Sequence, residues 1–503
     1  MRTRSPSTES VPLESALEVT QRSANGHLCS GQNSTDDDTD SEEESSADDR
    51  YWPWSPWDDA RFQGTLPLIL SARIPLEVFG LIINETDQPT SAAAALVCTA
   101  WYSRAMRVLY HEIQINDRTS FDMLSKQCRA SPRVKRWLAT THELVAKDNE
   151  CVFRTIARGP PFLQVLPIAL VHAMPGVRTL DIAGGDLRFV RPAFLVGLSH
   201  FKAVTSLFLR ECNLNNIEQL RRIVFAFPKL TDLSITHISL TQQLRGPACN
   251  MGATLVQSPR LRRLRIDLTT ESMATFVDCM TRSGCLTSLE ELTPLMDSRY
   301  EYFAHAMSKA LEAAGASLTL YHEQWAGNEC ETDGKSTCQL PPDLAADAHA
   351  QRTMYVGDDH GILSQNTALR SLEFTMNDIN PDIGDRALLW WVNWVDELYG
   401  VLSNIRSPDL ERIKIQSNLG YNTSDHDYKE LDIVLKKVDF VALHEVMGRS
   451  YFDVLEDVEV EMGLIGVMDD SIVDDVGRKL RRVYRGLLRP WSDRGIVSVT
   501  RWI

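Results

Sequence analysis

Several side chains that enzymes use are present in this chain, but they lack the spacing of a local catalytic motif. A histidine precedes a glutamate at four places, and none of the four has the second histidine that a zinc-protease helix needs. No Gly-x-Ser-x-Gly elbow and no Gly-x-x-x-x-Gly-Lys phosphate loop occurs. The four histidines are His111, His142, His322 and His444. We therefore predict no catalytic residue and no cofactor, and expect a protein that is not an enzyme.

The ten cysteines predict neither a metal site nor a disulfide framework. None belongs to a Cys-x-x-Cys pair. The nearest pairs, Cys279 with Cys285 and Cys330 with Cys338, do not have a zinc or redox spacing. Free, buried thiols in a reducing compartment are the expected state. We predict no bound metal.

Composition and charge narrow the class of protein. The chain has 503 residues, of which 43% are hydrophobic, so it is long enough for more than one folded unit. Its formal net charge of −16 argues against nucleic-acid binding, which needs a basic surface. It shows neither the apolar core of a secretory signal nor an apolar run of the roughly eighteen residues of a membrane span. We expect a soluble protein of the cytoplasm and/or nucleus, with no membrane partner.

The N-terminal region differs in composition from the rest. Residues 1–50 are rich in Ser, Thr, Asp and Glu, and residues 36–49 alone hold nine carboxylates. Too few apolar side chains are present to offset the entropy of ordering, so we predict a disordered acidic tail. A linker rich in Trp and Pro follows at residues 51–71.

Residues 72–115 predict three short helices and a strand. Pro75 suits the first turn of a helix, and Glu77 complements the positive end of its dipole. We expect Gln88-Pro89 to break the chain and Ser91 to cap a second helix at 92–98. A third helix is predicted at 101–110 and a strand at 112–115. The apolar side of the first helix comprises Ile74, Val78, Phe79 and Ile82.

This segment resembles an F-box, the adaptor-docking module of cullin-RING ubiquitin ligases. The resemblance rests on the Pro-x-Glu start, the Ala-Leu-Val-Cys sequence ending at Cys98, Trp101, and the Leu-Tyr-His exit at His111. It is greatest to F-box proteins of mushroom-forming fungi. The sequence departs from many F-boxes at Ile74, where they carry Leu, and in the small residues 92–95. The resemblance implies that a Skp-type adaptor, and through it a cullin, binds Ile74, Pro75, Leu76, Val78, Leu96, Val97 and Trp101.

An apolar-x-x-Leu-x-apolar pattern recurs from residue 175 to about 495. Its central leucines at 180, 207, 233 and 264 are separated by 27, 26 and 31 residues, which is leucine-rich-repeat spacing. The pattern returns near 289–292, 318–320, 369–374, 410–415 and 455–460. Each repeat predicts a strand followed by a helix that buries its apolar side by stacking on its neighbours. Cys212, three residues after Leu209, resembles a variant found in the leucine-rich repeats of F-box proteins.

The predicted fold is therefore α/β, with a three-helix F-box at 72–115 and an irregular leucine-rich-repeat-like solenoid at 175–495. Residues 116–174 are predicted to form a helical connector, and residues 322–361 a polar insertion. Trp390, Trp391 and Trp394 predict a buried helix.

Side chains that flank the strand leucines should lie on the open face of the sheet and contact a target protein. The target-binding residues predicted there are Ser206, Phe208, Arg210, Arg263, Arg265, Glu373 and Lys414. Together with the resemblance, they predict the substrate-recognition subunit of a Skp–cullin–F-box ubiquitin ligase. One alternative is a non-ligase binding scaffold with a vestigial F-box. Another is an enzyme whose active site is assembled from distant residues, for which a deep pocket with convergent polar groups would argue.

Overall fold

The computed structural model describes residues 75–148, 162–242, 258–296, 301–325, 363–376, 387–420, 436–465 and 470–502. Contacts divide the chain after Arg73, and all described residues belong to the second unit. The predictions for the acidic tail and the Trp/Pro-rich linker lie outside the described residues, as does most of the predicted insertion.

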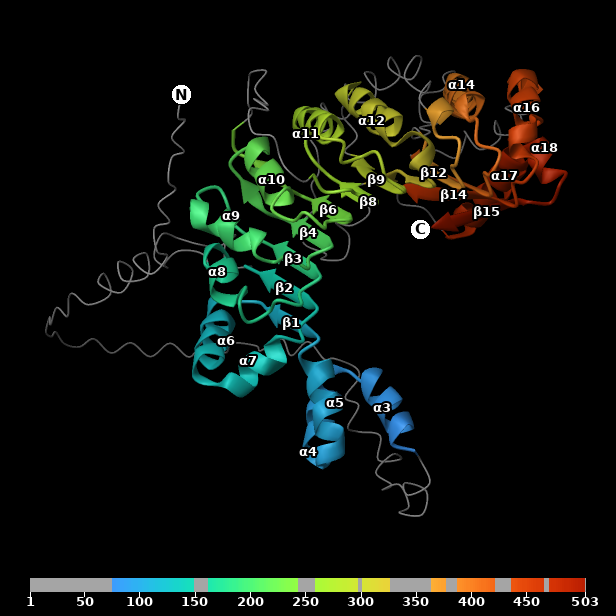
Figure 1. The fold of residues 1–503 in the computed structure, drawn as a ribbon. Coiled ribbons are helices and arrows are strands. Elements are labelled where there is room, and N and C mark those ends of the chain that lie inside the picture. Colours follow the sequence, from blue (N-terminus) through green and yellow to red (C-terminus); the bar gives the residue numbers. More distant parts are fainter. Residues whose placement is uncertain are drawn as a thin grey trace, which may run out of the picture. The chain divides into compact units, whose positions relative to one another are not determined.

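The second unit is built on a large parallel sheet, which confirms the α/β class (Figure 1). Its strands follow one another in chain order, and each pairs in parallel with the next. They are β1 (Glu112–Ile115), β2 (Glu143–Lys147), β3 (Thr179–Ala183), β4 (Ser206–Arg210), β6 (Asp232–Thr236), β8 (Arg263–Ile266), β9 (Glu291–Met296), β10 (Leu320–His322), β12 (Ser371–Thr375), β13 (Arg412–Gly420), β14 (Asp457–Ile465) and β15 (Val497–Trp502). The short β11 (Gln324–Trp325) also pairs with β9, and β5 (Asn213–Leu214) pairs with β7 (Ser239–Leu240).

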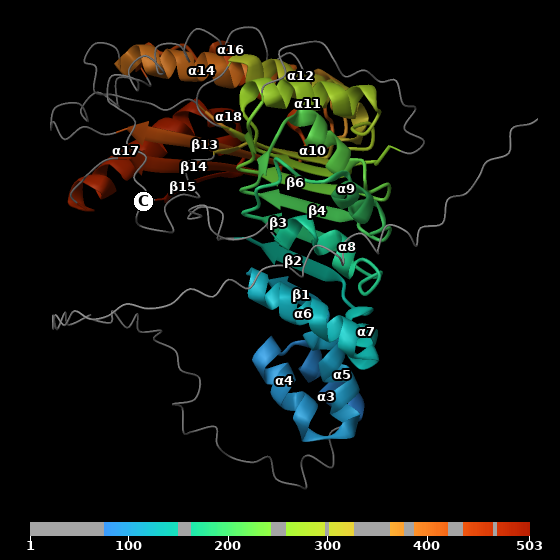
Figure 2. The same cartoon turned by 90° about the vertical axis from the view of Figure 1, so that its left-hand side faces the viewer.

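Most successive strands of the described residues have a helix between them, and α9 to α12 cover one face of the sheet (Figure 2). Along that face α8 contacts α9, α9 contacts α10, and α10 contacts α11. The helices are α6 (Arg118–Ala130), α7 (Pro132–Leu138), α8 (Leu166–Leu170), α9 (Pro192–Ser199), α10 (Ile217–Val224), α11 (Thr270–Arg282), α12 (Glu301–Ala314), α14 (Ala387–Asn404), α16 (Val441–Met447), α17 (Asp470–Leu487) and α18 (Arg489–Ser492). Single 3-10 turns, η3 (Phe162–Gln164), η4 (Gly315–Ser317) and η10 (Ser450–Phe452), complete the connections.

Alternation along strands such as β4 and β8 explains why one face is covered and the other is open. In β4, Leu207 and Leu209 are buried under the helices, whereas Ser206, Phe208 and Arg210 on the opposite face stay partly exposed. Side chains of successive strand residues point to opposite faces of a sheet, so a Leu-x-Leu strand has one apolar face. The open face is therefore polar and reachable.

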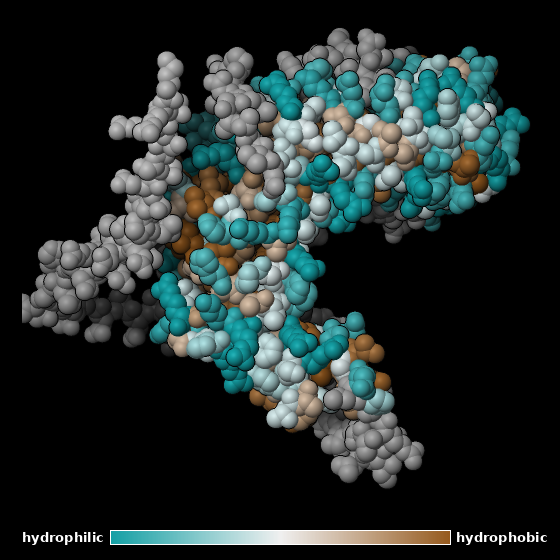
Figure 3. Space-filling model, in the orientation of Figure 1, coloured by the Kyte–Doolittle hydropathy of each residue, from teal (hydrophilic) through white to brown (hydrophobic). Residues whose placement is uncertain are grey.

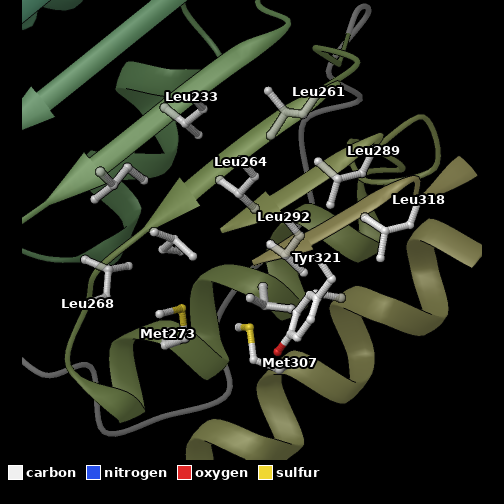
Figure 4. Packing of buried hydrophobic residues seen from close by; sticks show 14 of the residues in the cluster. Leu233, Leu261, Leu264, Leu268, Met273, Leu289, Leu292, Met307, Leu318 and Tyr321 are labelled. Carbon is white, nitrogen blue, oxygen red and sulfur yellow. The ribbon is translucent and has the colours of Figure 1, made fainter. Parts of the chain in front are cut away.

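One continuous core lies between the sheet and its helices, from Ile115 to Trp491. Figure 4 shows how it repeats: Leu233, Leu264 and Leu292 lie side by side on successive strands. Met273 of α11 and Met307 of α12 pack against them from the helical side. Farther along, Trp391 and Trp394 of α14 are buried against Tyr484 of α17, with ring centroids 5.8 and 5.4 Å from the tyrosine. Each unit thus covers the apolar face of its neighbour.

The sheet is longer than the sequence pattern predicts. Every predicted strand is present, but the predicted strand at 112–115 (β1) and the unpredicted β2 join the sheet before residue 175. The predicted helical connector at 116–174 therefore contains a sheet strand besides its helices. At the insertion predicted for 322–361, His322 and residues 324–325 belong to strands.

Three helices precede β1: α3 (Leu76–Asn84), α4 (Gln88–Val97) and α5 (Thr99–Leu109). We call residues 75–109 the helical module. The predicted break at Gln88-Pro89 is wrong, because both residues begin α4 and Pro89 fits its first turn. The predicted cap is also wrong: Asp87 accepts a hydrogen bond from the Thr90 amide at 3.0 Å. Ser91 is instead buried, with its Oγ 2.8 Å from Thr86 Oγ1.

Candidate functional site

The helical module has a small core of its own. Its buried apolar residues, Ile83, Ala94 and Ala105, form a cluster separate from the core of the sheet. Two of the three are alanines, so little apolar area is removed from water. A domain of this size is marginally stable by itself. The buried interior of the module therefore contributes little to its stability.

Specific polar and aromatic contacts join α3 to α5. Arg104 of α5 donates from Nε to Asn84 Oδ1 at the end of α3, at 2.9 Å. Phe79 and Trp101 pack with their ring centroids 4.9 Å apart, which joins α3 to α5. The predicted contact residue Trp101 is thus partly buried and contributes to packing inside the module.

Large aliphatic side chains of the module point into solvent. Leu96 is 88% exposed and Val97 62%, at the end of α4. On α3, Val78, Leu81 and Ile82 are exposed as well. Figure 3 shows apolar atoms at the surface around α3 and α4. We call these five residues the exposed aliphatic group.

The structure places the predicted adaptor-binding residues as follows. Pro75, Val78, Leu96 and Val97 are exposed on the module. Ile74 lies outside the described residues, and of Leu76 only the backbone is described. Sequence reasoning omitted Leu81, although its position three residues after Val78 put it on the same side of the helix.

The predicted target-binding residues lie on the open face of the sheet. The register aligns Ser206 with Asp232 and then with Arg263 across β4, β6 and β8. It aligns Glu373 with Lys414 across β12 and β13. Residues of neighbouring strands thus lie side by side and form a continuous row across the face. Phe208, Arg210 and Arg265 occupy the same face and are partly exposed.

In the first half of this face, ion pairs connect adjacent strands. Arg210 donates from Nε to Asp181 Oδ1 at 3.2 Å, and Arg263 pairs with Asp232. Ser206 donates from Oγ to Asp232 at 3.1 Å. Burial by itself raises the pKa of Asp232, but the hydrogen bond from Arg263 and those from Thr231 and Ser206 outweigh it and hold that pKa below its ordinary value. These ion pairs and hydrogen bonds hold the side chains of adjacent strands together.

The second half carries a denser polar network centred on Glu373 and Lys414. Lys414 Nζ lies 3.1 Å from Glu373 and 2.9 Å from Glu461. Gln416 donates to both carboxylates, at 3.2 and 3.0 Å. Burial lowers the pKa of Lys414, but its bonds to Glu461 and Glu373 outweigh this and raise it. On the other side of Glu373, the His322 ring lies 3.3 Å away.

Chemically, this face is suited to recognising a polar partner by charge and hydrogen bonds. Within the described ranges, no three metal-ligating side chains converge on one point. No helix in the described part of the chain has the length and apolar character to cross a membrane. Cys279 and Cys285 are both buried and belong to no disulfide, and Cys330 and Cys338 lie outside the described residues.

Comparison with known proteins assigns no family to the chain. No protein-family model matches it, and no curated protein matches it at a significant level.

Proposed function

We propose that this chain is the substrate-recognition subunit of a Skp–cullin–F-box ubiquitin ligase. The helical module acts as an F-box and binds a Skp-type adaptor, which connects it to a cullin. The sheet with its helices acts as a leucine-rich-repeat-like solenoid whose open face binds a target protein. The subunit contributes proximity: it raises the local concentration of target lysines at the site of ubiquitin transfer.

The observation that carries the proposal is the exposed aliphatic group on a module with a small core. A three-helix segment that leaves Leu81, Leu96 and Val97 more than half exposed has apolar surface that a partner would stabilise. The segment that resembles an F-box also contains the elements predicted for it, three short helices followed by a strand at 112–115. Aliphatic side chains of this kind fit the apolar groove of an adaptor.

The open face supports the second half of the proposal. Its charged side chains are held by neighbours on adjacent strands, so a partner meets a surface that is already organised. Preorganisation lowers the entropy lost on binding. Positive and negative groups alternate along it, which favours a protein partner with a complementary pattern of charge.

A matched pair of substitutions tests adaptor binding. Val97 is 62% exposed on the module and Val441 is 63% exposed at the start of α16. Burying a valine at an interface contributes about 1.5 kcal/mol, so Val97→Gln should weaken adaptor binding by about tenfold. Val441→Gln, the same chemical change at equal exposure, should leave it unchanged. Binding of a purified Skp-type adaptor to the full chain gives the measurement.

Equal affinity of both variants would contradict the assignment of the interface. Both should also unfold at the same denaturant concentration as the parent, since surface changes shift stability by only about 0.5 kcal/mol. If the chain bound no adaptor and brought down no cullin from its own cells, the alternative of a non-ligase scaffold would replace the proposal.

A further inference from the structure

A second surface, on the helical side of the sheet, has the features of a peptide-binding groove. Helices α6 and α8 line a cavity of about 670 Å³. Its apolar lining includes Ala169 of α8 and Phe121, which is buried and stacks on Phe162 with ring centroids 5.5 Å apart. Cavities that hold small ligands or anchoring side chains have volumes in this range.

The rim of this groove is positively charged, although the chain as a whole is acidic. Arg118, Lys126 and Arg129 line it together with one carboxylate, Asp122. Asp122 already pairs with Arg118 at 3.0 Å. Lys126 and Arg129 are exposed and form no ion pair with another described residue. The groove therefore offers two cations to an anionic partner in a protein of net charge −16.

An exposed apolar strip continues from the groove across α8 to α9. Val165 and Ile168 are 38% and 50% exposed, and Val196 on α9 is 56% exposed. Close packing joins the two helices, because a Cβ at Gly197 would lie only 2.9 Å from the side chain of Pro167. Helix α9 is apolar on almost all sides, and Figure 3 shows apolar atoms gathered around it. A surface helix normally keeps a polar outer face, so an apolar one indicates a contact surface.

We propose that this groove and strip bind a short acidic peptide segment of a partner protein. An aromatic or aliphatic anchor of the peptide occupies the groove over Phe121, and its carboxylates face Lys126 and Arg129. Further apolar side chains of the peptide cover Ile168 and Val196. A protein segment fits better than an anionic membrane, because the buried Phe121 lies in a cavity lined by α6 and α8, which a single inserted side chain can occupy. The proposal is independent of adaptor binding by the helical module.

A selection from displayed random peptides tests the chemistry without a known partner. Peptides about twelve residues long are selected on the full chain, and the enriched sequences are labelled with a fluorophore. We expect them to be rich in Asp and Glu around at least one aromatic or aliphatic residue. The double substitution Lys126→Glu/Arg129→Glu should weaken their binding by about tenfold or more, since attraction at two rim positions becomes repulsion.

The control is Lys436→Glu/Lys437→Glu, which makes the same change of charge at two exposed lysines elsewhere. It should change the affinity less than twofold. Ile168→Gln isolates the apolar contribution and should weaken binding severalfold at any salt concentration. Enrichment of peptides without acidic residues, or equal loss in both charge variants, would overturn the proposal. So would binding of phosphatidylserine vesicles that depends on Lys126 and Arg129 when no peptide binds.

Discussion

The helical module and the sheet region use the same aliphatic residues in opposite ways. In the sheet, Leu207, Leu233 and Leu264 are buried, because each strand-and-helix unit is covered by the next. In the module, Leu81 and Leu96 are exposed, and the interior is built largely from alanine. A repeating architecture covers its own apolar surface, whereas three short helices do not. Leucine is therefore buried in the core in one region and exposed to solvent in the other.

The largest predicted difference between the two regions is in the reactivity of their cysteine thiols. Cys98 is exposed at the end of α4, whereas Cys212 is buried after β4, and burial raises the pKa of Cys212 to about 12. A rise from 9.0 to about 12 lowers the thiolate population by about a thousandfold. Iodoacetamide at about pH 8, followed by peptide mass spectrometry, should label Cys98 and spare Cys212.

Unfolding in concentrated urea provides the control, because Cys212 should then be labelled as well. The adaptor should protect Cys98, which follows Val97 directly in the chain. Rapid labelling of Cys212 in the native protein would show that the sheet core opens as readily as the module.

Truncating a leucine should destabilise the sheet region more than the module. This difference between the two regions should be smaller than the difference in thiol reactivity. Leu207→Ala removes a fully buried side chain and should lower the free energy of unfolding by about 3 kcal/mol. Leu96→Ala removes a side chain that is 88% exposed and should change it by less than about 0.5 kcal/mol. Urea denaturation of both variants measures the difference. A large loss for Leu96→Ala would mean that Leu96 belongs to a core.

The smallest predicted difference between the two regions is in the pH dependence of stability, and it should arise in the sheet region. The described residues of the module contain no histidine, whereas His322 lies partly buried beside Glu373. Burial lowers the pKa of His322 below its ordinary 6.5, more than Glu373 raises it. Neutral His322 therefore contributes stability that is fully present above pH 6.5 and is lost as pH falls through the lower folded pKa.

His322→Gln should reduce the shift of the urea midpoint between about pH 7.5 and about pH 5.5. His200→Gln, at an exposed histidine of the same region, is the control. An unchanged shift in His322→Gln would assign the acid sensitivity to other groups.

The strands could be predicted where their apolar residues alternate, as in Leu207 and Leu209 of β4. Strand β2 was missed because Leu144, Val145 and Ala146 are buried in succession and give no alternation. The ion pair of Arg263 with Asp232 also could not be predicted, because the sequence of one strand does not determine its register with the next strand.

For the module and the strand after it, the sequence predicted three helices and the strand at 112–115 but misplaced the start of α4. Pro89 was interpreted as a break, although proline also fits the first turn of a helix. Which aliphatic residues stay exposed depends on the packing of α3 and α4 against α5, so Leu81 was not selected beforehand.

Hydrogen–deuterium exchange of the full chain, with and without a purified Skp-type adaptor, tests the central claim most directly. Binding that covers the exposed aliphatic group should stabilise the marginal module and slow exchange of the amides in α3 to α5. Amides of β4, β6 and β8, already protected by the continuous core, should exchange at unchanged rates. Unchanged exchange throughout α3 to α5 at saturating adaptor would contradict the account.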